Sequence, residues 1–117
     1  MKKWLIISGI SGFLAVALGA FGAHGLKSQL TPEIFEIFKT GVLYHLIHSV
    51  VLLALGLSGL EKFNKSAIFI SIGILLFSFS LYLYSVTEVK FFAFITPFGG
   101  VSFLVGWAML VYAGVKN

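Results

Sequence analysis

The chain has 117 residues, of which 59% are hydrophobic and 10% charged, and its mean hydropathy is +1.06. A soluble domain of this size has too much surface to hide so much apolar side chain, so the composition indicates a protein surrounded largely by lipid. Cysteine is absent, which excludes disulfides and thiolate chemistry. The net charge of +4 comes from lysines that stand singly or in pairs rather than forming a basic face for nucleic acid.

Four apolar segments are long enough to cross a bilayer as helices. A helix rises about 1.5 Å per residue, so about 20 residues span a hydrocarbon core of about 30 Å. The four segments are residues 4–26, 40–60, 66–86 and 95–115. Two tight turns and one longer connection join them. This order predicts an all-α, antiparallel four-helix bundle in which residues 1–117 form a single transmembrane domain.

Small residues line the first segment at helical spacing. Ser11, Ala15, Gly19 and Ala23 lie four residues apart, and Gly19, Gly22 and Gly25 repeat every three. Helices in lipid associate through close backbone approach at small residues, so we expect this stripe to pack against another helix. Two preceding lysines and the small residues near its end also suit a secretory signal. The apolar stretch exceeds the usual core of about 7–15 residues, however, which favours a retained span.

The connection between the first two spans, residues 27–39, has a helical pattern of its own. Thr31, Pro32 and Glu33 supply a capping hydroxyl, a proline at the first helical position and an acid in the first turn. Glu33, Glu36 and a lysine then recur every three residues among apolar side chains. One polar stripe on an apolar helix predicts a short interfacial helix before the chain turns into the second span.

The three histidines are the candidate functional residues. His24 ends the first span, while His45 and His48 lie near the start of the second, three residues apart and therefore on one helix face. The antiparallel order predicts that all three lie in the same half of the membrane. The other polar side chains expected in this cluster are Thr40, Tyr44 and Thr96.

Three roles are open to this cluster. The favoured role is structural, because a polar side chain buried in a bundle needs hydrogen-bond partners and thereby fixes helix register. A metal or haem site is the second, because imidazole binds zinc, copper and iron, although the spans contain no carboxylate to orient such ligands. The third is a proton or small-solute path, since histidine titrates near neutral pH. One four-span protomer is small for a transporter, so a path requires an oligomer. We expect no metal or other cofactor.

The fourth span opens on Thr96, Pro97, Phe98, Gly99 and Gly100. Proline is tolerated in the first turn of a helix, where its missing N–H has no partner to lose. The two glycines then allow a second close helix crossing. Aromatic residues expected near the membrane–water interfaces are Trp4, Tyr82, Tyr84, Trp107 and Tyr112.

The distribution of charge predicts the orientation. Five lysines lie on the side of the two termini, whereas the opposite side has three lysines balanced by Glu33, Glu36 and Glu88. Positive residues accumulate on the cytoplasmic side, so both termini are predicted to be cytoplasmic. The chain has no pair of carboxylates placed for acid–base catalysis and no nucleophile motif of a hydrolase. We therefore expect no enzymatic activity.

Several of these stretches together resemble a known family. They are GAFGAHGLK (19–27), FKTGVLYHLIHSVVLLALG (38–56), LFSFSLYLYSVT (76–87) and TPFGGVSFLVGWAML (96–110). In this order they are similar to the small bacterial membrane proteins catalogued as domain of unknown function number 423, which are related to eukaryotic transmembrane protein 256. The resemblance implies a four-helix protein of the bacterial cell membrane. It implies no reaction, substrate or cofactor, but some relatives are linked to membrane integrity.

We therefore expect a non-enzymatic structural or organising protein that supports membrane integrity through helix–helix contacts. Its expected surroundings are the lipid bilayer and a second copy of the chain, with another membrane protein as a further possible partner. The alternative is a solute, proton or ion pathway, or a metal- or haem-binding subunit, centred on the histidines.

Overall fold

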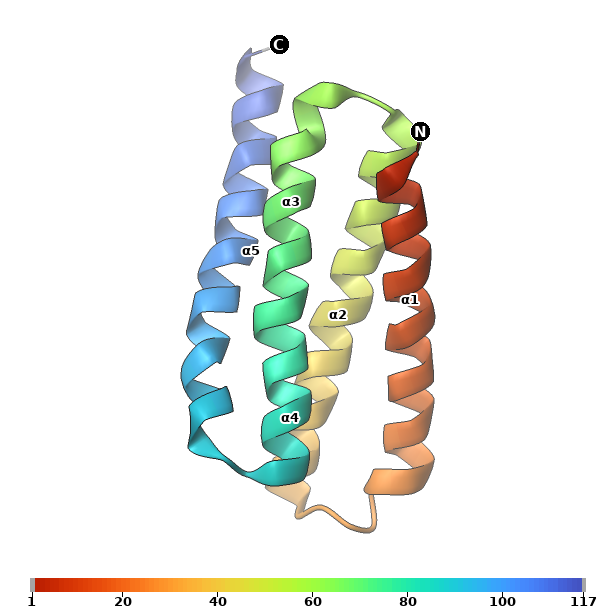
Figure 1. The fold of residues 1–117 in the computed structure, drawn as a ribbon, viewed down its shortest axis with the longest axis vertical. Coiled ribbons are helices and arrows are strands. Elements are labelled where there is room, and N and C mark those ends of the chain that lie inside the picture. The colour runs from red at the N-terminus through yellow and green to blue at the C-terminus, as the bar shows by residue number, and fades with distance from the viewer. Residues whose placement is uncertain (1, 117) are drawn as a thin grey trace.

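The structure, a computed structural model, describes residues 2–116 as four long antiparallel crossings (Figure 1). The first crossing is α1 (Lys3–Phe21) with a π-helical turn at Gly22–Leu26, and the second is α2 (Pro32–Ser58). The third crossing consists of a 3-10 turn (Glu61–Phe63), α3 (Asn64–Gly73), a π-helical turn (Ile74–Ser78) and α4 (Phe79–Thr87). The fourth is α5 (Lys90–Lys116).

All four crossings are long and apolar enough to span a membrane. They contain 24, 27, 27 and 27 residues. A helix of 27 residues is about 40 Å long, which exceeds the hydrocarbon core, so its ends reach the headgroup region. Both termini lie at the same end of the bundle (Figure 1). The predicted all-α membrane bundle is thus confirmed.

The second crossing differs from its prediction in one respect, because α2 has no separate interfacial helix before it. The predicted start is correct: the Thr31 side-chain oxygen accepts a hydrogen bond from the Ile34 backbone N–H at 3.2 Å, and Pro32 occupies the first turn. From there one helix runs without a break to Ser58. Phe38 is buried rather than lying at the interface, since it packs beside Leu26 and Tyr82.

The fourth crossing also begins earlier than predicted. Helix α5 starts at Lys90, so Pro97 lies inside the helix and not in its first turn. The apolar residues before the proline extend the helix toward the headgroups. Proline removes one backbone N–H from the ladder, a loss that helices in membranes tolerate.

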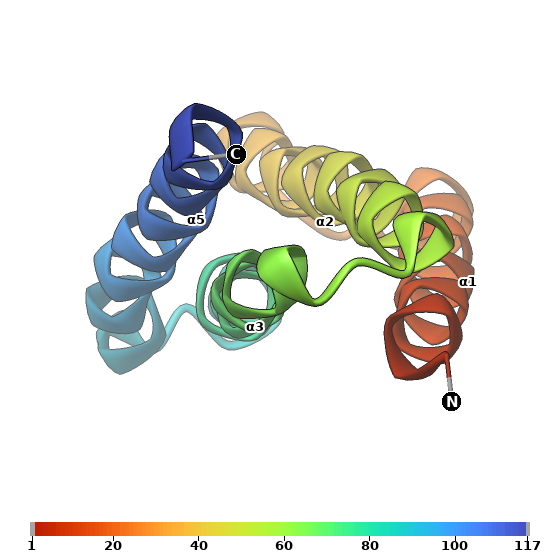
Figure 2. The ribbon, with the colours of Figure 1, turned by 90° about the horizontal axis from the view of Figure 1, so that it is seen from above.

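The helices form an open arrangement rather than a square bundle (Figure 2). Helix α2 packs along α1, and α5 packs along α3 and α4. Seen from above, α1 and α5 lie on opposite sides, and α3 lies between them in front of α2. The main apolar core consists of Leu52, Ala67, Ile70, Ile74 and Phe103. Most of the remaining large apolar side chains face outward, as a lipid solvent requires.

Candidate functional site

His45 lies at the centre of a buried polar network near the middle of α2. The side chain is 0% exposed, and both ring nitrogens have partners on other helices. Nδ1 lies 2.8 Å from the Tyr82 hydroxyl of α4, and Nε2 lies 3.1 Å from Oγ of Ser11 in α1. Ser49 completes the network, because its Oγ lies 2.6 Å from that of Ser11.

The donors and acceptors of this network can be assigned by counting protons. The Ser49 hydroxyl donates to the carbonyl oxygen of His45 at 2.7 Å, which uses its only proton. Ser11 therefore donates to Ser49 and accepts from the Nε2–H of His45. This tautomer leaves Nδ1 as an acceptor for the Tyr82 hydroxyl. Each hydroxyl and each ring nitrogen thus has a defined partner.

His48, one turn further along α2, has the opposite tautomer. Its Nδ1–H donates to the carbonyl oxygen of Tyr44 at 2.7 Å, and its Nε2 accepts from the indole N–H of Trp107 at 3.1 Å. The imidazole stacks on the Phe103 ring with the centroids 3.8 Å apart. His48 is 4% exposed. Both nitrogens are satisfied here as well, one within α2 and one by α5.

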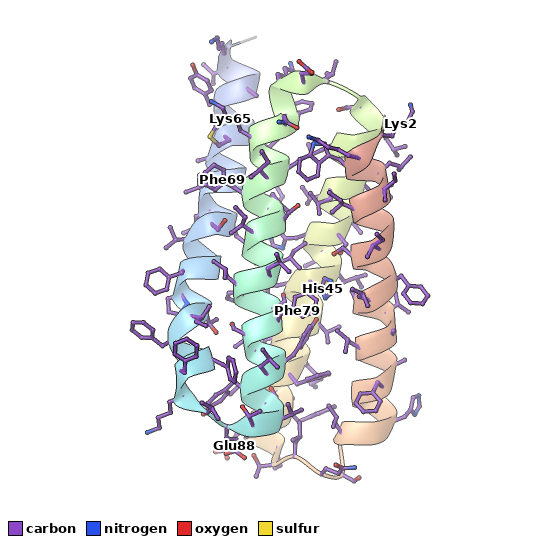
Figure 3. All side chains as sticks on the ribbon, viewed as in Figure 1. Lys2, His45, Lys65, Phe69, Phe79 and Glu88 are labelled. Carbon is purple, nitrogen blue, oxygen red and sulfur yellow. The ribbon has the colours of Figure 1, made fainter. Side chains whose placement is uncertain are left out.

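The two histidines together connect α2 to every other crossing. His45 bonds to α1 and α4, and His48 bonds to α5. The spacing of three residues places the rings on adjacent parts of one helix face, so a single turn of α2 holds all three attachments. Figure 3 shows His45 beside Phe79 near mid-height, with Lys2 and Lys65 at one end and Glu88 at the other. We call Ser11, His45, His48, Ser49, Tyr82 and Trp107 the histidine network.

The structure does not bring His24 to the other two histidines. His24 is exposed, in the π-helical turn that ends the first crossing. Ser11, which marks the level of His45 on α1, lies 13 residues earlier. That separation corresponds to about 20 Å along the helix.

The other polar residues expected in the cluster have different partners. Thr40 is exposed and donates to the Glu36 carbonyl oxygen at 3.0 Å. Thr96 lies 2.5 Å from the Ser80 hydroxyl, which links α5 to α4. Tyr44 contributes its carbonyl to His48, and its ring packs at 4.7 Å from that of Phe77.

Sequence reasoning missed four members of the network. Ser11 was expected on the packing stripe of the first span but not as a partner of His45, and nothing in the sequence marks Ser49 as facing it. Tyr82 and Trp107 were expected at the interfaces, but both bond to the histidines at mid-height. For Trp107 the available signal was its position, since it lies well inside an apolar segment and a buried indole N–H usually has a partner; Tyr82 lies near the end of its segment and offers no such signal.

Glycines allow the close crossings on which the network depends. Of those singled out in the sequence, Gly22 faces the Phe38 ring and Gly99 faces the Phe77 backbone, with no room for a Cβ at either position. Gly19 is less tight, because a Cβ there would lie 3.2 Å from Val42. Of the remaining members of that set, Ala15 is buried and Ala23 is exposed, a Cβ at Gly25 would lie 3.0 Å from the Phe21 ring of its own crossing, and Gly100 makes only ordinary contact. Close glycine contacts that were not predicted are at Gly41, Gly56, Gly73 and Gly106.

Residues 2–116 contain no group of three or more histidine or acidic side chains arranged to hold a metal ion. The two buried histidines could offer a ligand only by giving up a hydrogen bond inside the bundle. This arrangement is suited to joining helices, and the fold and the network together define a four-span α-helical membrane protein.

The chain belongs to the family described as protein of unknown function (DUF423), whose model matches residues 18–100. It is 43% identical over 121 residues to the UPF0382 membrane protein YwdK of Bacillus subtilis, covering 99% of this chain and 98% of the relative. It is 39% identical over 116 residues to the UPF0382 inner membrane protein YgdD of Escherichia coli K12, covering 96% and 88%. No solved structure matches the chain. The protein is therefore a multi-pass protein of the bacterial cell membrane.

Proposed function

We propose that the protein is a non-enzymatic structural element of the membrane, which supports membrane integrity as a rigid, internally fastened bundle. The observation that carries this proposal is the full occupation of the four ring nitrogens of His45 and His48 by partners in the chain. A buried imidazole whose two nitrogens are both hydrogen-bonded stabilises one helix arrangement. It has no free nitrogen lone pair or N–H group with which to bind a ligand.

The same observation weighs against a proton or solute path through the histidines. The hydrogen bonds run from Tyr82 through His45, Ser11 and Ser49 and return to the His45 carbonyl oxygen. A relay needs an entrance and an exit, and this chain of bonds turns back to His45, a residue that it has already passed. Catalysis has no better support, because neither imidazole has a free nitrogen to accept a substrate proton.

The proposal also includes self-association, which would extend a rigid bundle into a larger membrane scaffold. The two glycines with the least room, Gly22 and Gly99, face other parts of the same chain. The contact between copies would therefore use an outer face, such as that of α1, where Gly9 has open space in front of it. Chemical cross-linking in native membranes should give a discrete dimer or higher species. A strictly monomeric pattern would remove this part of the proposal.

The experiment that tests the fastening role compares His45→Ala with His24→Ala in purified protein and in cells. We expect His45→Ala to lower the unfolding temperature in detergent and to raise dye leakage in a strain that depends on this protein. His24→Ala should change neither. Metal analysis and an absorption spectrum of the unmodified protein should show no stoichiometric metal or chromophore. A bound metal lost in His45→Ala, or a proteoliposome flux that depends on His45, would contradict the proposal.

A further inference from the structure

Helix α1 and the third crossing leave an open seam between them. Each packs against α2, but they make little backbone contact with each other along their length (Figure 2). A hydrogen bond crosses the seam at the end of the bundle that carries the chain termini. There the indole N–H of Trp4 donates to the side-chain oxygen of Asn64 at 2.8 Å. Two cavities lie in this seam, floored by α2.

The first cavity is at the end that carries the termini. Its volume is about 510 Å³, and its lining includes Lys2, Lys3, Trp4, Gly59 and Asn64. The ammonium group of Lys3 lies 5.3 Å from the centre of the Trp4 ring. Gly59 ends α2 in a left-handed conformation, and the space in front of it is open. The cavity is therefore cationic and polar, at the level where α1 begins and α2 ends.

One acidic residue partly neutralises the positive charge of this cavity. Glu61 also lines the cavity, so two lysines face one carboxylate and the local balance is +1. Lys62 and Lys65 lie on the same end of the molecule but outside the cavity lining. The cavity thus offers two cations to an anion, within a wider basic surface.

The second cavity lies directly below the first and is apolar. Its volume is about 220 Å³, and its walls come from all three helices, chiefly Ile7, Ile10, Leu14, Leu52 and Leu75. Ile10, Leu14 and Leu75 are exposed and border the open side, which faces the bilayer core. His45 and Ser11 lie at its floor, but they are bonded to each other.

The linings of the two cavities adjoin on α1 and α2. On α1 the lining continues from Trp4 to Ile7, and on α2 from Leu55 to Leu52, each a step of less than one helical turn. On the third crossing it continues from Asn64 to Ser71, two turns away. A basic recess at the headgroup level therefore leads into a hydrocarbon groove in the same seam.

We propose that this seam is a binding site for an anionic phospholipid, with the phosphate between Lys2 and Lys3 and one acyl chain in the groove below. Charge complementarity selects the headgroup, and the apolar walls open to the bilayer select the chain. Lysines near an anionic lipid surface contribute about 5-fold each to binding. With one lysine offset by Glu61, we expect about 5-fold tighter binding of phosphatidylglycerol than of phosphatidylcholine with identical chains.

Native mass spectrometry of the full-length protein in detergent, supplied with equal amounts of the two lipids, measures this preference. The K2Q/K3Q double variant leaves Glu61 as the one charged side chain in the cavity lining, so the preference for phosphatidylglycerol should be lost or reversed. The matched control is K62Q/K65Q, which removes the same charge from the same end but from outside the cavity, and it should keep the preference. All four lysines are exposed, so neither variant endangers the fold.

A second variant tests the groove. Leu14→Trp fills its open side, so it should reduce binding of both lipids while leaving their ratio unchanged. Glycerol phosphate at millimolar concentration, which supplies the headgroup without chains, should not displace the bound lipid.

Four results would overturn the proposal. They are an equal loss of preference in both lysine pairs, unchanged binding in Leu14→Trp, displacement by glycerol phosphate, and equal binding of phosphatidylglycerol and phosphatidylcholine by the unmodified protein. The seam site and the histidine network use different polar groups, so the failure of one leaves the other standing.

Discussion

Replacing His45 with leucine should destabilise the bundle by an amount that can be worked out from its contacts. The substitution replaces the imidazole with an apolar side chain of similar size and removes the hydrogen bonds to Tyr82 and Ser11, at 2.8 and 3.1 Å. Hydrogen bonds between membrane helices average about 0.6 kcal/mol and reach about 1.7 kcal/mol. The loss of two such bonds predicts a decrease of about 1 to 3 kcal/mol in the free energy of unfolding.

The assay is reversible unfolding in mixed detergent micelles, followed by circular dichroism. His24→Leu is the matched control, because it removes the same side chain from an exposed position and should change stability by less than about 0.5 kcal/mol. A double-mutant cycle with Tyr82→Phe isolates the bond between the two side chains, since that variant removes only the hydroxyl oxygen.

The cycle should give a coupling free energy of about 0.6 to 1.7 kcal/mol between His45 and Tyr82. Strict additivity of the two substitutions would refute this bond, because the imidazole and the hydroxyl would then act independently. An equal loss of stability in His24→Leu and His45→Leu would also refute the role of the network, since the effect would then come from removing any histidine from a helix.

Three further outcomes are expected. Nitrogen-15 solid-state NMR should show opposite tautomers, with the proton of His45 on Nε2 and that of His48 on Nδ1; the same tautomer at both would contradict the hydrogen-bond assignment. Trp107→Phe should lower the free energy of unfolding by about 0.6 to 1.7 kcal/mol in the micelle assay, because it removes the N–H that His48 accepts while keeping an aromatic ring. Gly99→Ala should cost at least about 1 to 3 kcal/mol, because its Cβ meets the backbone of the third crossing, whereas Gly100→Ala should be tolerated; equal costs would refute the close crossing.

The crossings could be predicted from sequence because their signals are local. Hydropathy identifies each apolar segment, and the Thr31 and Pro32 cap identifies where α2 begins. The depth of the histidines in the membrane was harder to predict. It depends on whether the helix that begins at Thr31 and Pro32 and the second span form one continuous helix. Since α2 starts at Pro32 and not near residue 40, its histidines lie about 12 Å further along the helix than expected.

The partners of the histidines could not be predicted, because they depend on how each helix is rotated. The third crossing contains a π-helical turn at Ile74–Ser78, which adds a residue to one turn and changes the face that α4 presents. Tyr82 reaches His45 from beyond that turn. Regular helical periodicity through the third crossing therefore assigns the wrong neighbours to the residues after it.

The hydrogen bonds between the helices determine how each helix is rotated about its axis, which apolar packing alone does not. A leucine on a membrane helix is as well solvated by lipid tails as by another helix, so apolar contacts alone give little preference for one rotation over another. A hydroxyl, an indole N–H or an imidazole has no such equivalence, because lipid tails offer it no partner. The bonds from α2 to α1, α4 and α5 therefore define the rotation of all four crossings, and glycines such as Gly99 allow the backbones to come close enough for the bonds to form. On this basis the histidines select one arrangement among many of similar apolar burial, which is why their removal should loosen the bundle without unfolding any single helix.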